Sequence, residues 1–90
     1  MGSALHHYRS VMIKWEPKYR YEEVADDLRE RIASGEFPPR TAIPAIPRIM
    51  QQYEIGRNTA LRAVYQLAEE GTVVIKRSQG TFVVPPEDRE

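Results

Sequence analysis

The residues best suited to recognition chemistry stand close together in a stretch that is expected to be helical. Arg57 and Arg62 carry planar guanidinium groups, and Asn58 carries a carboxamide. A guanidinium can donate two hydrogen bonds to O6 and N7 of guanine, and a carboxamide can bond to N6 and N7 of adenine. Leu61 offers an apolar surface that can pack on the methyl group of thymine. These residue types predict contacts with base edges in the major groove of DNA.

A second polar cluster follows, between two runs rich in β-branched residues. The runs 72–76 and 81–84 predict a hairpin, or wing, around a glycine-containing turn. Cationic and amide side chains on such a turn suit the phosphate backbone or the minor groove, and glycine permits close approach. The residues concerned are Lys76, Arg77, Ser78, Gln79 and Gly80. The positive end of the preceding helix, residues 56–59, suits a phosphate.

The helix expected from Arg57 to Gly71 separates the recognition residues from an apolar face. Successive residues turn by about 100° around a helix axis. Asn58, Arg62 and Tyr65 therefore fall nearly opposite the apolar set, with Leu61 beside them. The expected core face comprises Ala60, Ala63, Val64 and Leu67.

The first helix is expected from Tyr21 to Ser34, because apolar residues recur there on one stripe. Its first half is acidic, where the helix dipole favours anions, and Gly35 stands where a left-handed residue ends a helix. These carboxylates are interpreted as a solvated face, since no histidine or further carboxylate joins them at metal-ligand spacing. The expected core stripe comprises Tyr21, Val24, Ala25, Leu28 and Ile32.

Prolines interrupt residues 36–44, which are expected to form a connector without regular structure, with Phe37 and Ile43 buried. A short second helix is expected from Pro47 to Tyr53, since proline is tolerated in a first helical turn. A tight, glycine-containing turn at 54–56 then leads into the recognition helix. The buried side of the second helix is expected to comprise Ile46, Ile49, Met50 and Tyr53.

Length and composition predict one small folded domain in the cytoplasm. The chain has 90 residues, of which 41% are hydrophobic and 29% charged. No apolar run approaches the roughly 20 residues that span a bilayer, and the start lacks a secretory signal. Cysteine is absent, the two histidines are adjacent, and no nucleophile or phosphate-loop motif occurs. Neither an enzyme nor a bound cofactor or metal is expected.

The formal net charge is zero, but it is unevenly distributed. Residues 1–39 hold six Lys and Arg against seven Asp and Glu. Residues 40–84 hold six Lys and Arg against three Asp and Glu, and residues 85–90 carry one Arg against three acids. The positive charge therefore lies on the half that holds the recognition residues, as a local patch with modest nonspecific affinity for nucleic acid.

Residues 19–84 resemble the winged helix-turn-helix domain of the GntR family of bacterial transcription regulators. The resemblance implies an α+β fold of three helices and a two-stranded wing, with base reading by Arg57 and Thr59. The wing would contact DNA through residues that include Gly80 and Thr81. The resemblance rests on four segments that follow one another in the family's order: Ile32-Ala33-Ser34-Gly35, Ile43-Pro44-Ala45-Ile46-Pro47-Arg48, Ile55-Gly56-Arg57-Asn58-Thr59-Ala60-Leu61 and Gly80-Thr81-Phe82-Val83.

The chain departs from the family pattern at positions that bear on DNA contacts. Ala45 and Gly56 replace capping serines, so two helix caps and two hydroxyls are lost. Pro47 replaces an arginine, and the adjacent Arg48 is the candidate substitute. Leu61 stands where the family has a second recognition arginine, while this chain has Arg62 one residue later. The operator is therefore expected to differ from the common family sequence.

The resemblance implies a transcriptional regulator, expected to be a repressor, that binds a double-stranded DNA operator as a homodimer. Two half-sites would lie about one helical turn apart. No small-molecule effector domain is recognised in the sequence. Residues 1–18 are interpreted as an N-terminal arm, with Trp15 as a candidate dimer anchor, and residues 85–90 as a charged tail.

An interaction module that uses the same fold to bind protein is the alternative. Near-neutral charge and the lost phosphate ligands favour it, whereas Arg57, Arg62, Lys76 and Arg77 disfavour it. Steep salt dependence of binding would distinguish DNA recognition, because neutralising phosphates releases many counterions.

Overall fold

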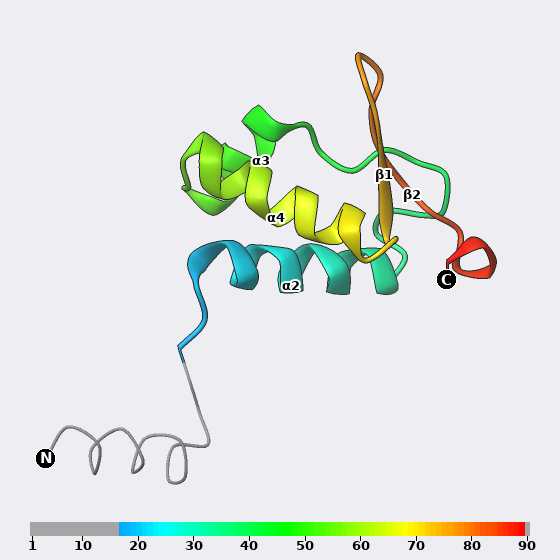
Figure 1. Ribbon diagram of the computed structural model, residues 1–90, viewed down its shortest axis with the longest axis horizontal. Coiled ribbons are helices and arrows are strands. Elements are labelled where there is room, and N and C mark those ends of the chain that lie inside the picture. Colours follow the sequence, from blue (N-terminus) through cyan, green and yellow to red (C-terminus); the bar gives the residue numbers. More distant parts are fainter. Residues whose placement is uncertain (1–16, 90) are drawn as a thin grey trace, which may run out of the picture.

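The computed structural model describes residues 17–89 as three helices followed by a β-hairpin (Figure 1). This arrangement confirms the predicted winged helix-turn-helix, with element boundaries within one or two residues of those expected. Of the arm expected at residues 1–18, residues 1–16 lie outside the described residues, and so does the candidate dimer anchor Trp15. The elements are α2 (Arg20–Ala33), α3 (Ile46–Tyr53), α4 (Arg57–Glu69), β1 (Val73–Lys76), β2 (Gly80–Val83) and a 3₁₀ turn (Pro86–Asp88).

Residues close to each end of α2 determine where the helix begins and where it ends. The backbone N–H of Tyr19 donates to Oε1 of Glu22 at 3.0 Å, so a first-turn carboxylate ties down the residue before the helix. At the other end Gly35 has φ of 90°, and the N–H of Glu36 donates to the carbonyl of Arg31 at 3.0 Å. The predicted glycine stop is confirmed.

The core lies where α2 packs along α4, with α3 and the hairpin closing its ends (Figure 1). The predicted apolar face of α4 is confirmed, because its four residues are at most 2% exposed. Tyr21, expected in the core stripe of α2, is only half-buried. The buried hydrophobic residues are Val24, Ala25, Leu28, Ile32, Ile43, Ile49, Ala60, Ala63, Val64, Leu67, Val73 and Val83.

The connector before α3 pairs with the hairpin at one point. Strands β1 and β2 pair antiparallel, with Val73 opposite Val83. The far edge of β2 pairs with the connector, where Ala42 forms a bridge to Phe82 and the N–H of Ile43 donates to the carbonyl of Thr81 at 2.8 Å. The prolines flank this short run without interrupting it, so the connector is irregular as predicted except for one bridge to β2.

The tight turn between α3 and α4 lies at residues 54–56, as expected. The left-handed residue is Glu54, with φ of 54°, whereas Gly56 has φ of −78° and precedes α4 as its N-cap. A Cβ at Gly56 would meet no heavy atom within 4 Å. Glycine is therefore not required there by backbone geometry or by space.

The described part of the C-terminal segment packs onto the domain. Pro85 is buried, the 3₁₀ turn follows, and Nε of Arg89 donates to the carbonyl of Val84 at 2.9 Å. The charged segment expected at residues 85–90 thus lies against the domain as far as residue 89.

A bidentate ion pair joins α2 to the end of α4. Arg29 donates from Nε and Nη2 to the two carboxylate oxygens of Glu70, at 3.0 and 2.7 Å, and from Nη1 to Asp26 at 2.7 Å. These hydrogen bonds from Arg29 hold the pKa of the Glu70 carboxyl below its usual 4.5.

Leu67→Ala is expected to lower the free energy of unfolding by about 2–5 kcal/mol, because a fully buried side chain leaves a cavity between α2 and α4. Leu61→Ala in the same helix is the matched control, since Leu61 is only half-buried, and it should cost at most about 1 kcal/mol. Urea unfolding followed by circular dichroism measures both. Equal losses would contradict the assigned core face.

Arg29→Met is expected to reduce the loss of stability on acidification. The folded-state pKa of Glu70 is lowered, so its contribution is present above pH 4.5 and is lost as the pH falls through that lowered value. Unfolding free energies measured from neutral pH down to about pH 2 should therefore converge for the wild type and the variant. Arg77→Met, which removes a wing cation, should keep the wild-type pH dependence.

Candidate nucleic-acid interface

The first turns of α4 present the predicted recognition residues outward. Arg57, Asn58 and Arg62 are exposed, and Thr59 and Leu61 are half-buried. Gly56 gives α4 no side-chain cap, so its first-turn N–H groups receive no hydrogen bond from the N-cap side chain. The positive end of the helix dipole is thus available to an anion.

The hairpin forms a wing whose turn is exposed. Ser78 has φ of 69° and Gly80 has φ of 130°, and the N–H of Gln79 donates to the carbonyl of Lys76 at 2.9 Å. Lys76, Arg77, Gln79 and Gly80 are exposed and Thr81 is half-buried. This tight turn therefore directs two cations and an amide away from the domain.

The start of α3 is the third place where a DNA contact was predicted, through Arg48. Arg48 lies in the first turn of α3, is exposed, and follows an N-cap, Ala45, that makes no side-chain hydrogen bond. Helix α3 and the wing lie on the side of α4 away from α2 (Figure 1). The structure thus brings the α3, α4 and wing candidates onto one side of the domain.

Ion pairing divides the cations of residues 18–77 into two groups, and Arg89 in the C-terminal segment belongs to neither. On α2 and the residues that flank it, Lys18, Arg20, Arg29 and Arg31 each contact a carboxylate. The side chains of the second group form no ion pair and no hydrogen bond within the described residues. That second group comprises Arg40, Arg48, Arg57, Arg62, Lys76 and Arg77.

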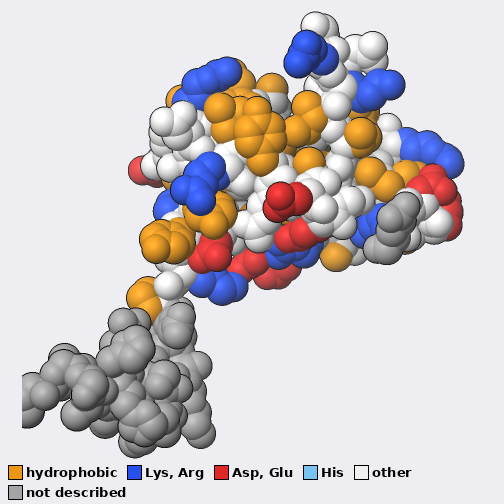
Figure 2. All heavy atoms as spheres, in the orientation of Figure 1, with side chains coloured by type: hydrophobic (Ala, Val, Ile, Leu, Met, Phe, Trp, Pro, Cys, Tyr) orange, Lys and Arg blue, Asp and Glu red, His pale blue; other side chains and the backbone are white. Residues whose placement is uncertain are grey.

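Hydrophobic side chains are exposed between these cations. Tyr65 on α4 is 56% exposed, and Val74 and Ile75 on β1 are 45% and 42% exposed. Figure 2 shows a hydrophobic area on this face, with Lys and Arg side chains at the wing tip and along the borders. The two strand residues were not predicted as surface residues, because β-branched residues in a short strand are equally typical of a core.

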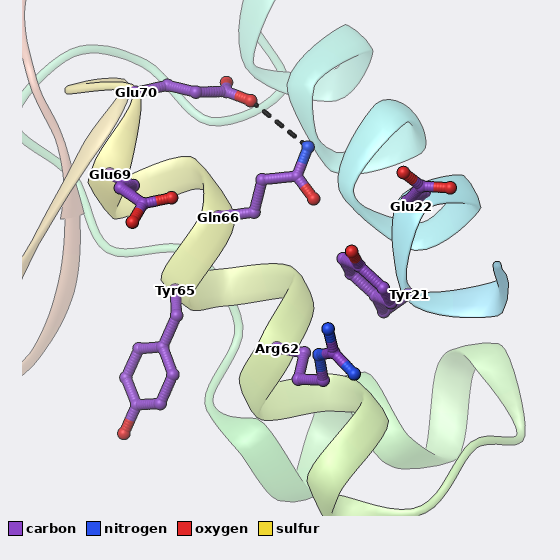
Figure 3. A pocket seen from close by; sticks show the side chains of 7 residues that line it. All are labelled: Tyr21, Glu22, Arg62, Tyr65, Gln66, Glu69 and Glu70. Atoms are coloured by element: carbon purple, nitrogen blue, oxygen red, sulfur yellow. Dashed lines mark hydrogen bonds between the residues drawn. The ribbon is translucent and has the colours of Figure 1, made fainter. Parts of the chain in front are cut away.

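Arg62 has a neighbour that the sequence did not indicate. Its guanidinium carbon lies 4.3 Å from the centre of the Tyr21 ring, which α2 supplies. Figure 3 shows the two side chains at an open cavity of about 600 Å³ between α2 and α4, with Tyr65 pointing away from Tyr21. Helical periodicity placed Tyr21 in the core stripe, and for that reason its contact with Arg62 was not predicted.

Residues 17–89 contain neither a metal-binding cluster nor a membrane-spanning helix. No group of three His, Cys, Asp or Glu residues there is placed to hold a metal ion. In the same part of the chain, no helix combines the length and the apolar character needed to cross a membrane.

Known proteins with similar sequences are regulators of bacterial genes. The histidine utilization repressor of Klebsiella aerogenes is 36% identical over 66 residues, which are 73% of this chain and 27% of that protein. The Exu regulon transcriptional regulator of Escherichia coli K12 is 31% identical over 74 residues, or 82% of this chain and 29% of that protein. The chain thus spans little more than a quarter of the length of these relatives.

Solved structures agree in fold. AraR(DBD) in complex with operator ORE1 superposes with a TM-score of 0.73 at 28% identity, covering 76% of this chain and 83% of that one. The NTD of AraR in complex with mutant ORR3 superposes with a TM-score of 0.74 at 27% identity, covering 78% of this chain and all of that one. The family model for bacterial regulatory proteins of the gntR family matches residues 20–83, from the first residue of α2 to the last of β2. The chain therefore belongs to the gntR family of bacterial regulatory proteins.

Proposed function

We propose that residues 19–84 form the DNA-reading domain of a bacterial transcriptional repressor. Helix α4 enters the major groove, and the wing contacts the backbone or the minor groove. The observation that carries this proposal is the group of exposed cations on α3, α4 and the wing that lack ion-pair partners within residues 17–89. Phosphates neutralise such a group, whereas the cations beside α2 already have carboxylate partners.

Four residues at the start of α4 form the base-reading set. Arg57 is assigned to O6 and N7 of guanine, and Asn58 to N6 and N7 of adenine, because both are exposed in the first turn. Thr59 and Leu61 are half-buried beside them, and Leu61 supplies an apolar contact to a thymine methyl group.

The remaining residues of the proposed interface contact the DNA backbone or the minor groove. Arg48 replaces the family arginine at the start of α3, and Arg62 is a further DNA contact on α4. Gly80 lets the wing approach closely, because it carries no side chain. The wing contacts are Lys76, Arg77, Gln79, Gly80 and Thr81.

A homodimer on two half-sites is part of the same proposal. The similarity to AraR domains in complex with operators supports the DNA partner. Two-fold pairing follows from the half-site geometry of helix-turn-helix proteins. Such a regulator acts in the cytoplasm without enzymatic activity of its own.

Binding to another protein is the second candidate function. The exposed Tyr65, Val74 and Ile75 favour it, because apolar patches bordered by polar residues mark protein contacts. The two functions differ in salt dependence, since protein contacts release few counterions.

Arg57→Ala is expected to weaken binding to the preferred duplex by about 1–3 kcal/mol and to relax the preference at one guanine position. The measurement is enrichment from a random duplex library, followed by fluorescence anisotropy on the best duplex. Arg20→Ala is the matched control, because it removes an arginine from the α2 side. An unchanged base preference in Arg57→Ala would contradict the assigned role.

Arg77→Ala is expected to weaken binding to preferred and scrambled duplexes alike, and to reduce the salt slope by about one counterion. The slope is that of log affinity against log salt, measured by anisotropy on both duplexes. Failure of the wild type to bind or enrich any duplex would overturn the DNA-reading proposal and favour the protein-binding module.

A further inference from the structure

The contact between Arg62 and Tyr21 crosses from α4 to the first turn of α2. The Arg62 guanidinium stands over the Tyr21 ring, 4.3 Å from its centre. Such cation–π stacking restricts the torsions of a long arginine side chain, while the N–H groups stay available at the edge of the planar group. Arg62 is therefore oriented before any partner arrives.

The direction of Arg62 separates it from the other outward residues of α4. In Figure 3 its side chain bends toward α2, whereas Tyr65, one turn along, points away from α2. Asn58, Leu61 and Tyr65 follow each other at spacings of three and four residues and so form one line along the helix. Arg62 lies at the α2 border of that line. A helix in a major groove faces base edges along its centre line and phosphates along its borders.

Two of the three carboxylates beside Arg62 already accept hydrogen bonds from other groups of the domain. Glu22, Glu69 and Glu70 also line the cavity. Of the seven residues that line it, Arg62 alone carries a positive charge. Glu70 accepts hydrogen bonds from Arg29, and Glu22 accepts one from the N–H of Tyr19. Among residues 17–89 none of these carboxylates forms an ion pair with Arg62, so its charge remains available to a phosphate at this border.

We infer that Arg62 contacts a DNA phosphate at the α2 border of α4, and that Tyr21 is the positioning residue that holds it there. The inference rests on the proposed DNA-reading function and refines it, because Arg62 then contributes affinity without reading a base. The second arginine of this helix thereby differs in role from Arg57.

The first experiment compares Arg62→Met with the wild type. Methionine keeps a flexible apolar side chain about as long as the aliphatic stem of arginine, which can still pack on the Tyr21 ring, but it removes the guanidinium and its charge. Enrichment from a random duplex library gives the base preference, and anisotropy on preferred and scrambled duplexes gives the salt slope. The expected result is roughly tenfold weaker binding to both duplexes, a slope smaller by about 0.9, and an unchanged base preference.

The second experiment tests Tyr21 through a double-mutant cycle. Tyr21→Leu removes the ring and should weaken binding, whereas Tyr21→Phe keeps the ring and should bind like the wild type. In the Arg62→Met background, Tyr21→Leu should have no further effect, because its influence passes through the Arg62 charge. Thermal melts of each variant identify any loss of folding, and the phenylalanine variant remains informative if the leucine variant is unstable.

The outcomes separate this inference from the function on which it rests. If the wild type enriches no duplex, the DNA-reading function itself fails. If the wild type enriches a motif and Arg62→Met relaxes one base position with the salt slope unchanged, Arg62 reads a base and the phosphate assignment is wrong. Additive losses from Tyr21→Leu and Arg62→Met, or a loss in Tyr21→Phe equal to that in Tyr21→Leu, would remove Tyr21 from the positioning role.

Discussion

The close packing of α2 against α4 is the contact on which the interface depends. Ala60 and Ala63 present small side chains to this contact, and the fully buried Val24, Leu28 and Leu67 fill it. Burial of this one face fixes the rotation of α4 about its axis, since a helix can turn only one stripe toward a neighbour. The exposure of Arg57 and Asn58 then follows from the burial of residues on the opposite side. The wing is fixed in turn, because Val73 and Val83 are buried in the same core.

The charged side chains are also divided between the α2 side of the domain and the side that holds α3, α4 and the wing. A net charge of zero is unusual for a nucleic-acid-binding protein, but net charge does not determine the local potential. Carboxylates on and beside α2 neutralise the cations on that side, as Asp26 of α2 and Glu70 at the end of α4 do with Arg29. The cations on α3, α4 and the wing have no such partners among residues 17–89. Ion pairing on one side of the domain therefore leaves a cationic surface on the other.

The departures from the family pattern change two helix caps and the position of one arginine. Neither Ala45 nor Gly56 caps its helix with a side chain, as expected from the loss of two serines. Arginine stands at position 62 in place of 61, and this shift brings the guanidinium over Tyr21. A displacement of one residue around a helix is about 100°, which is enough to exchange the middle of an exposed face for its border.

The sequence by itself determined the three helices, the wing, and which face of α4 is buried, because helical periodicity and glycine stops are local signals. It also indicated which residues at the start of α4 would be exposed. Only the tertiary structure decided the pairing of Ala42 with Phe82, the stacking of Arg62 on Tyr21 and the exposure of Ile75. These features join residues far apart in the chain or depend on how completely a neighbour covers them. Periodicity reports the direction of a side chain from its own helix or strand, and not what stands opposite it.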